Sequence, residues 1–466
     1  MQFIRRAFSE TYFLKTIVCV SLVAHMAVFF ALLWLHGPYS FFLSPDGSLH
    51  DNDTQHYVII AKNLAEGNGY SRFAEAPYEP DSLRTPLLPF YFVPFIYLGG
   101  LGTIWLAIML LNILLALAPV VTYTIARFFV SHRMSSVAAL GMVFEPLYLY
   151  RSQIAEPDAL FVLFSLGAML FLVRYWRTAL SRDWYTVCAI LGISILAKPS
   201  ATYVTVIVCV FSIAHTFIFW RSQIRQRLLE ISIGILIIVV CISPWALRNH
   251  AVFGVWGISS ISGYNLYQYY TRPFALADEH LPESMLAVRE PSRSLTYQSY
   301  FTHVALERIA HAPVTYAREH IIGSIRNLFV SDLPAIYYYG HADILPFPYN
   351  PESKISIHDV LSRGDTSALI AAIVHNIPKM IWVLGMIFIY SCALLGWVVS
   401  WRRDTTVFLL FSLFAALFVY FIVSSGPFVD AKYRLPAVPL VIIVSLYGIT
   451  YLQTFFASKR AARLAK

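Results

Sequence analysis

Few residues of this chain could take part in acid–base chemistry or hold an anion, and most of them adjoin long apolar segments. Asp51 and Asp53 form one acidic pair, and Glu156 and Asp158 form another just before an apolar run. Basic residues in comparable places are Arg84, Lys198, Arg248, Lys432 and Arg434. A carboxylate can take a proton from a hydroxyl group, and lysine and arginine can hold a phosphate and offset its growing charge as it leaves. These residue types suit group transfer from a phosphate, if the fold brings them together.

The composition indicates a membrane protein. Of 466 residues, 58% are hydrophobic and only 13% are charged, which is too apolar for a soluble chain of this length. Runs of about 20 apolar residues are typical of transmembrane helices. We expect ten spans, at roughly 13–35, 103–126, 134–151, 157–173, 184–197, 199–220, 228–247, 378–400, 405–424 and 435–457. No small-residue cleavage site follows the first run, so we expect a retained helix rather than a signal peptide.

Clusters of lysine and arginine lie at alternate ends of these spans. They are Arg5, Arg6 and Lys15; Arg127 and Arg133; Arg174, Arg177 and Arg182; Arg221, Arg225 and Arg227; Arg402 and Arg403; and Lys459, Arg460, Arg463 and Lys466. Short loops rich in these residues stay in the cytoplasm. This pattern predicts that both termini are cytoplasmic. It also explains the net charge of +8 through topology and contact with membrane lipids, without a nucleic-acid partner.

The segment 86–98 is apolar but short for a span, and it contains three prolines. If it crossed the membrane, every later basic cluster would move outside. We therefore expect a half-buried or re-entrant helix on the outer face. With this assignment, Asp53, Arg84, Glu156, Lys198 and Arg248 all lie on the outer side, where they could share one cavity.

The expected fold is an all-α integral membrane protein of three parts. Residues 1–248 form a membrane module with a first outer loop at 37–102, residues 249–377 form a small extracytoplasmic subdomain of mixed structure, and residues 378–466 form the last helices and a basic tail. In the first loop, the spacing of Tyr57, Ile60, Ala61 and Leu64 predicts a helix at 54–66 that lies on the membrane surface with its apolar face down. In the subdomain, 299–310 and 314–329 are amphipathic helix patterns.

Several polar residues leave more than one interpretation open. Asp51 and Asp53 could hold a divalent cation such as Mg²⁺ or Mn²⁺, although acids in such a loop are more often only solvated, and we expect no cofactor. Glu145 falls within the third predicted span, where an acid usually faces a cavity; it could instead pair with Arg151. His56 is expected to be solvated. All five cysteines lie in apolar segments, so no outer disulfide framework or Cys/His metal site is expected.

Five segments resemble motifs of a known family in family order. The run that begins Asp53-Thr-Gln-His-Tyr57 and ends Gly69-Tyr70-Ser71 is similar to the first-loop signature of GT-C fold glycosyltransferases of the dolichyl-phosphate-mannose–protein mannosyltransferase type, which includes the bacterial aminoarabinose transferase of lipid A. The later matches are Arg84-Thr-Pro86-Leu-Leu-Pro89, Gln153-Ile-Ala-Glu156-Pro157, Pro244-Trp245-Ala-Leu-Arg248-Asn249 with Phe253-Gly254, and Tyr433-Arg434-Leu-Pro436. The resemblance is weakest at 270–295.

The resemblance implies an inverting glycosyltransferase with a polyprenyl-phosphate sugar as donor and a lipid, glycan or protein as acceptor. Asp53 matches the family's catalytic aspartate and Glu156 its second acid, while Arg84 and Lys198 fall where the family places phosphate-binding residues. We expect Arg248 to assist them. Secondary site candidates are Asp51, Tyr57, Glu145, Asp158 and Arg434.

Two other functions remain open. A transporter or flippase of a lipid-linked sugar should show internal repeats and ionisable groups near the middle of the membrane, and the chain shows no repeat. A polymerase or ligase of lipid-linked glycans would share the outer site and differ in its donor. The compact outer region favours a bacterial inner-membrane enzyme with its active site outside the cytoplasm.

Overall fold

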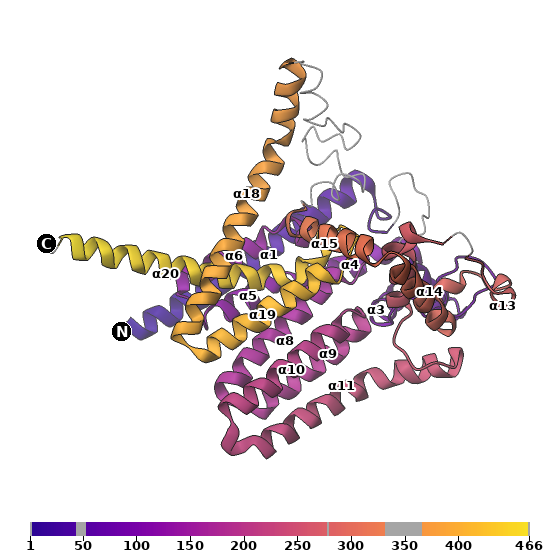
Figure 1. Ribbon diagram of the computed structural model, residues 1–466, viewed down its shortest axis with the longest axis horizontal. Coiled ribbons are helices and arrows are strands. Elements are labelled where there is room, and N and C mark those ends of the chain that lie inside the picture. The colour runs from indigo at the N-terminus through magenta and orange to yellow at the C-terminus, as the bar shows by residue number, and fades with distance from the viewer. Residues whose placement is uncertain (1, 43–52, 277–278, 331–365, 465–466) are drawn as a thin grey trace.

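The computed structural model describes residues 2–42, 53–276, 279–330 and 366–464, and within these ranges the chain is helical with no strand (Figure 1). The membrane part contains α1 (Gln2–His36), α4 (Ile104–Leu115), α5 (Ala118–Ala126), α6 (His132–Val143), α7 (Pro146–Arg151), α8 (Asp158–Thr178), α9 (Ser181–Ala197), α10 (Ala201–Phe219), α11 (Ile224–Phe253), α18 (Thr366–Arg403), α19 (Thr405–Val423) and α20 (Val438–Leu464). The first outer loop contains α2 (Asp53–Ala65) and α3 (Leu87–Gly99). The outer region contains α12 (Ile261–Asn265), α13 (Glu283–Leu286), α14 (Gln298–His311) and α15 (Pro313–Phe329).

Eight helices in the described ranges are long and apolar enough to cross a membrane, where the sequence predicted ten spans. They are Glu10–His36, Leu101–Ala126, Asp158–Thr178, Ala201–Phe219, Arg221–Phe253, Met380–Arg403, Thr405–Val423 and Ala431–Arg463. The predicted span 184–197 is helix α9, which has 17 residues. The chain is an integral, multi-pass membrane protein.

The predicted span 134–151 is two short helices rather than one. Helix α6 ends at Val143, and α7 starts at Pro146, whose ring nitrogen cannot donate the hydrogen bond that a continuous helix needs. Glu145 caps α7, because its carboxylate accepts a hydrogen bond from the backbone N–H of Tyr148 at 2.5 Å. The acid in this segment therefore stabilises a helix start at the break.

Helix α3 has 13 residues, so it is about 20 Å long and shorter than the hydrocarbon core of about 30 Å. It packs against α2 and α4, in agreement with a helix at 86–98 that does not span. The expectation for α2 needs correction. Instead of lying on the membrane surface, α2 is buried on most sides, including its polar residues Gln55, His56 and Asn63. The segment that follows covers it, and Asn63 donates to the carbonyl groups of Ser71 and Phe73.

Helices α18 and α20 pack closely through glycine. A Cβ atom at Gly448 would lie 2.2 Å from the carbonyl oxygen of Cys392, and one at Gly396 would lie 2.3 Å from that of Val444. Small residues let helix backbones approach in this way in a bilayer, where apolar side chains gain nothing by leaving lipid. Helices α18 and α20 therefore pack against each other with their backbones in contact.

The outer region lies at one end of the bundle, and both labelled chain ends lie toward the opposite end (Figure 1). Helices α14 and α15 occupy the two amphipathic stretches predicted from the sequence. The expected mixture of helix and strand is not confirmed, since the described part of this region is helical. Residues of the outer region and of the first outer loop line one cavity together with the ends of α8, α10 and α19.

Candidate active site

A cavity of about 800 Å³ lies where the first outer loop, the ends of the membrane helices and the outer region meet. Its walls come from α2, from the start of α8, from the turn between α9 and α10, from α12 and α14, and from the segment before α20. Its charged lining residues in the described part of the chain are Asp53, Arg84, Glu156, Asp158, Lys198, Arg293, Asp430 and Lys432. Segments that are distant in the sequence thus place acidic and basic side chains together in the wall of one cavity.

Asp53 is the first residue of α2 that the structure describes, and its side chain is 46% exposed in the cavity wall. Its Oδ1 atom lies 2.5 Å from Nη2 of Arg84, and its Oδ2 atom lies 3.8 Å from Nζ of Lys432. Burial acts to raise the pKa of this carboxyl, but the charges of Arg84, Lys432 and His56 outweigh it and hold the pKa below its usual range. Asp53 is therefore an ionised carboxylate that can accept a proton.

Arg84 is 6% exposed and is held from several sides. Its Nε atom donates to Nδ1 of His56 at 3.1 Å, and its guanidinium lies over the ring of Tyr57 at 5.6 Å from the ring centre. Burial acts to lower the pKa of Arg84, but the carboxylate of Asp53 raises it above its usual value. The guanidinium is thus a fixed positive charge. His56, expected to be solvated, is instead buried and orients this arginine.

Glu156 is 5% exposed and lies in the short segment between α7 and α8. Its Oε2 atom is 2.6 Å from Nη1 of Arg151, and its Oε1 atom accepts a hydrogen bond from the hydroxyl of Thr54 at 2.9 Å. Burial raises the pKa of Glu156 more than Arg151 lowers it. Arg151 also lies 3.7 Å from Asp430.

Lys198 and Asp158 form an ion pair at the membrane end of the cavity, with 2.5 Å between Nζ and Oδ1. Helix α9 ends at Ala197, which leaves Lys198 at its terminus, and α8 begins at Asp158. Lys198 also lies 5.7 Å from the ring centre of Phe161. A primary amine in the wall of a cavity can bind an anion such as a phosphate.

The opposite wall of the cavity belongs to the outer region. It contains Tyr264, Tyr269, Gln298, Thr302 and Arg293, of which Arg293 donates to the hydroxyl of Tyr264 at 3.1 Å. Hydroxyl, amide and aromatic groups of this kind suit a polar substrate with many hydroxyl groups. The cavity therefore has one end lined by paired acids and bases and another, formed by the outer region, that is rich in hydroxyl groups.

The structure separates the sequence candidates into two groups. Asp53, Tyr57, Arg84, Glu156, Asp158 and Lys198 line the cavity. Arg248, Arg434 and Glu145 do not line it. Arg248 was expected to assist in phosphate binding, but it stacks on the rings of Tyr70, Trp245 and Phe253 and donates to the carbonyl group of Asp81. Arg434 is 3% exposed and donates to the carbonyl group of Asn327. Asp51 lies outside the described residues.

Lys432, which the sequence places with Arg434 just before the last span, lies between acids of the cavity, 3.8 Å from both Asp53 and Asp430. Of these two basic residues only Lys432 lines the cavity. Arg293 was missed because it falls where the motif resemblance is weakest.

No three His, Cys, Asp or Glu side chains lie together in a metal-binding arrangement within the described ranges. The cavity acids Asp53, Glu156 and Asp158 each have a basic partner within 2.6 Å. Lysine and arginine thus stand at the positions where a cation would offset these carboxylates.

Comparison with known proteins adds to this geometry. Residues 84–247 match the family model of dolichyl-phosphate-mannose-protein mannosyltransferase. The oligosaccharyltransferase AglB from Archaeoglobus fulgidus, solved with an inhibitory peptide and a dolichol-phosphate, aligns with 98% of this chain at 12% identity and a TM-score of 0.54. The chain has the GT-C fold. The resemblance read from the motifs is thereby confirmed.

Other comparisons define how far the similarity goes. The same archaeal enzyme in its apo form aligns with 97% of the chain at 12% identity and a TM-score of 0.51. ArnT from Cupriavidus metallidurans, solved with undecaprenyl phosphate, aligns with 91% of this chain and 77% of its own at 14% identity, with a TM-score of 0.37. The chain spans about half of the length of the archaeal enzyme, since the alignment covers 52% of that enzyme. Among curated proteins, none matches the chain.

Proposed function

We propose that the protein is a glycosyltransferase that moves a sugar from a polyprenyl-phosphate donor to a hydroxyl group outside the cytoplasm, with inversion at the anomeric carbon. The observation that carries this proposal is the ionised carboxylate of Asp53, held in the cavity wall between Arg84 and Lys432. A base beside two cations suits the attack of a hydroxyl group on a phosphate-linked sugar, because the base can take the proton and the cations can offset the charge on the leaving phosphate.

In this reaction the acceptor oxygen attacks the anomeric carbon from the side opposite the phosphate. Asp53 takes the hydroxyl proton as the new carbon–oxygen bond forms. The bond from the anomeric carbon to the phosphate oxygen breaks, and the polyprenyl phosphate leaves with the electron pair. Arg84, Lys198 and Lys432 offset the charge that grows on the leaving phosphate. Glu156 accepts hydrogen bonds from Arg151 and Thr54 beside this centre. In this role it orients its basic partner or the acceptor.

The two ends of the cavity suggest where each substrate binds. The lipid donor would approach between α10 and α19, where Tyr203 and Tyr420 line the cavity beside Lys198. The acceptor, a lipid, glycan or protein, would enter beneath the outer region, against Tyr264 and Gln298. The archaeal enzyme of the same fold holds a dolichol-phosphate in its solved complex, which supports a lipid-phosphate donor.

The basic clusters support a topology with both termini in the cytoplasm and the cavity outside, as in an enzyme of a bacterial inner membrane. The reaction as proposed uses the protein's own cations and no divalent metal. Transfer that continues in the presence of EDTA is the expected result, and loss of transfer that Mg²⁺ or Mn²⁺ restores would reject this part of the proposal.

The test is a transfer assay with purified protein and radiolabelled polyprenyl-phosphate sugars. Asp53→Asn removes the base and keeps the size of the side chain, so transfer should fall by at least about 100-fold, the lower range for a general base. Glu279→Gln is the control, since Glu279 pairs with Arg308 in the outer region and does not line the cavity. Near-normal transfer by the Asp53→Asn variant would reject the assignment.

A second candidate is a ligase or polymerase of lipid-pyrophosphate-linked glycans, which the similarity to an archaeal oligosaccharyltransferase favours. The same assay with a lipid-pyrophosphate-linked glycan as a second donor separates the two, because a ligase would use that donor and leave the monophosphate donor unreacted. Movement of the labelled lipid across a vesicle without a glycosylated product would instead indicate a flippase.

A further inference from the structure

The segment 81–84 carries Arg84 to Asp53, and its four carbonyl groups and the N–H groups of Asp81 and Arg84 have hydrogen-bond partners. The N–H of Asp81 donates to the carbonyl of Tyr70, and the hydroxyl of Tyr70 donates back to the carbonyl of Arg84 at 3.1 Å. The N–H of Arg84 donates to Oδ2 of Asp81 at 2.8 Å. A short segment outside the helices has no regular hydrogen bonds of its own, so these contacts determine where the Arg84 side chain begins.

The outer region supplies the other partners of this segment. The N–H of Ser260 donates to the carbonyl of Ser82, and the hydroxyl of Ser259 donates to the carbonyl of Leu83 at 2.6 Å. The N–H of Leu295 donates to the hydroxyl of Ser82 at 2.8 Å. Three hydrogen bonds therefore connect the outer region to Ser82 and Leu83, the two residues that precede Arg84.

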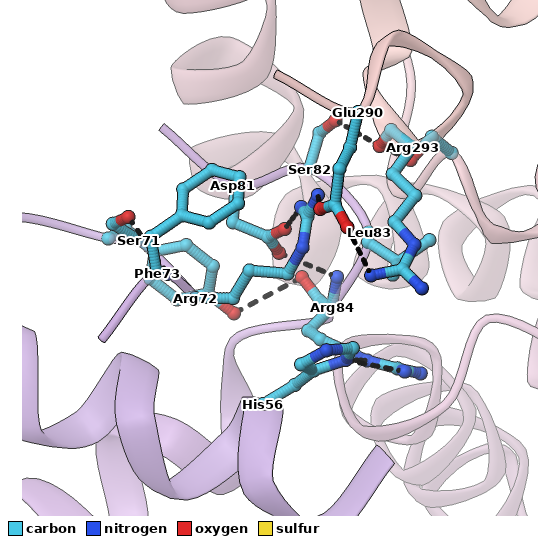
Figure 2. Close-up of polar contacts among 12 residues, drawn as sticks. His56, Ser71, Arg72, Phe73, Asp81, Ser82, Leu83, Arg84, Glu290 and Arg293 are labelled. Atoms are coloured by element: carbon cyan, nitrogen blue, oxygen red, sulfur yellow. Dashed lines mark hydrogen bonds and ion pairs between the residues drawn. The ribbon is translucent and has the colours of Figure 1, made fainter. Parts of the chain in front are cut away.

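One arginine connects the two parts by charge. Arg72 pairs with Asp81 through Nη1 and with Glu290 of the outer region through Nη2 (Figure 2). Arg72 and Asp81 are almost fully buried, with 5% and 0% of their side chains exposed. Glu290 also pairs with Arg293, which lines the cavity, at 3.0 Å. The path therefore runs from Glu290 through Arg72 and Asp81 to the backbone N–H of Arg84.

The backbone at Glu290 adds a second observation. Its φ angle is +55°, a left-handed conformation that costs a residue with a side chain about 1 kcal/mol or more. A glycine or asparagine would adopt this turn at lower cost. The glutamate side chain thus stands at a position where its backbone conformation is disfavoured, and its ion pairs with Arg72 and Arg293 can offset that cost.

We propose that Glu290, Arg72 and Asp81 are positioning residues that hold Arg84 against Asp53, so that the seating of the outer region determines whether the site is assembled. Arg248 belongs to the same arrangement through its hydrogen bond to the carbonyl of Asp81. This inference rests on the proposed function in so far as its effect is measured by sugar transfer. It assigns a role to residues that touch neither substrate.

A double-mutant cycle between Glu290 and Arg84 tests the path. Glu290→Gln should lower kcat for transfer by up to about 100-fold, the effect of a small misplacement of a catalytic group. In an Arg84→Gln background the same change should cause little further loss, because the group it positions is already gone. An equal fold-loss in both backgrounds would show that Glu290 acts independently of Arg84 and would overturn the proposal.

Glu279→Gln is the matched control. Glu279 is also an acid of the outer region in an ion pair with a buried arginine, Arg308, but that pair does not reach the segment 81–84. Any effect of Glu279→Gln on the outer region should therefore leave kcat unchanged in both backgrounds. If Glu279→Gln lowered kcat as much as Glu290→Gln does, the effect of Glu290→Gln would come from a general loss of stability of the outer region, and the proposal would be overturned.

A measurement without substrate keeps the proposal separate from the proposed function. In hydrogen–deuterium exchange, Glu290→Gln should speed exchange of the amides in peptides that cover 81–87, and Glu279→Gln should not. Unchanged exchange at 81–87 in the Glu290→Gln variant would overturn the proposal whatever the activity is. If the unaltered protein transfers no sugar while exchange responds as expected, the proposed function fails and the positioning path stands.

Discussion

Replacing Arg151 by methionine is expected to destabilise the folded protein by about 3 kcal/mol, the lower end of the range for breaking a buried ion pair. Arg151 is 1% exposed and Glu156 is 5% exposed, with 2.6 Å between Nη1 and Oε2. The methionine leaves the carboxylate buried without its closest cation. The lower end applies because Thr54 still donates to Glu156 and Lys432 remains near it.

The double variant Arg151→Met with Glu156→Gln should recover most of that loss. Both buried charges are then gone, and replacing a whole buried pair is often close to neutral. Asp430, which lies 3.7 Å from Arg151, keeps its contact with Lys432 at 3.8 Å and so does not become a new unpaired acid. Thermal unfolding of the purified proteins in detergent, followed by tryptophan fluorescence, measures these differences.

The pH dependence of the single variant gives an independent check of the cause. Burial already raises the pKa of Glu156 in the folded protein, and loss of Arg151 raises it further. The folded state then binds more protons than the unfolded state, so stability falls as the pH rises from the usual carboxyl value, about 4.3, through the raised folded value. The deficit of Arg151→Met should therefore be smallest near pH 4. A deficit that is independent of pH, together with a double variant no more stable than the single one, would refute the reasoning.

Three further outcomes are expected. Lys198→Met should raise the KM for the lipid donor about 10- to 100-fold by removing a charged hydrogen bond to its phosphate, and adding Asp158→Asn should restore thermal stability without restoring KM. Gln298→Ala should raise the KM for the acceptor and leave that for the donor unchanged, so equal effects on both would contradict the two-ended cavity. Gly448→Val should lower stability by about 1–3 kcal/mol through overpacking against α18. Gly385→Val is the control. Gly385 lies on α18, no atom lies within 4 Å of its Cβ position, and the change should alter stability by less than about 0.5 kcal/mol in the unfolding assay.

The apolar helices were predictable because hydrophobic length is a local property of the chain. The predicted spans 157–173 and 405–424 correspond closely to Asp158–Thr178 and Thr405–Val423. The sequence also contains a sign of the break at Glu145, because a proline follows this residue. The apolar residues on both sides of Glu145 nevertheless led to the prediction of one continuous span. The burial of α2 was not predictable, because it depends on the segment 70–84 folding back over its polar face.

The acids and bases of the site were predicted to share the outer side, and the structure sorts them further. Arg248 and Lys198 have the same charge and adjoin the same side of the membrane, yet only Lys198 lines the cavity. Which way a side chain points from the end of a helix depends on the neighbours of that helix. Sequence position alone therefore could not separate a cavity lysine from an arginine that supports the backbone of Asp81.

The sequence by itself determined which segments enter the apolar layer and that the reactive residue types gather at one face, because both follow from transfer of side chains and charges between water and lipid. Only the tertiary structure decided which of those charges meet. The contact of Arg72 with Glu290 joins residues 218 positions apart, and Asp53 meets Lys432 across most of the chain. Pairs of this kind form only when separate elements pack, so their distances, and the chemistry that follows from them, are properties of the folded arrangement.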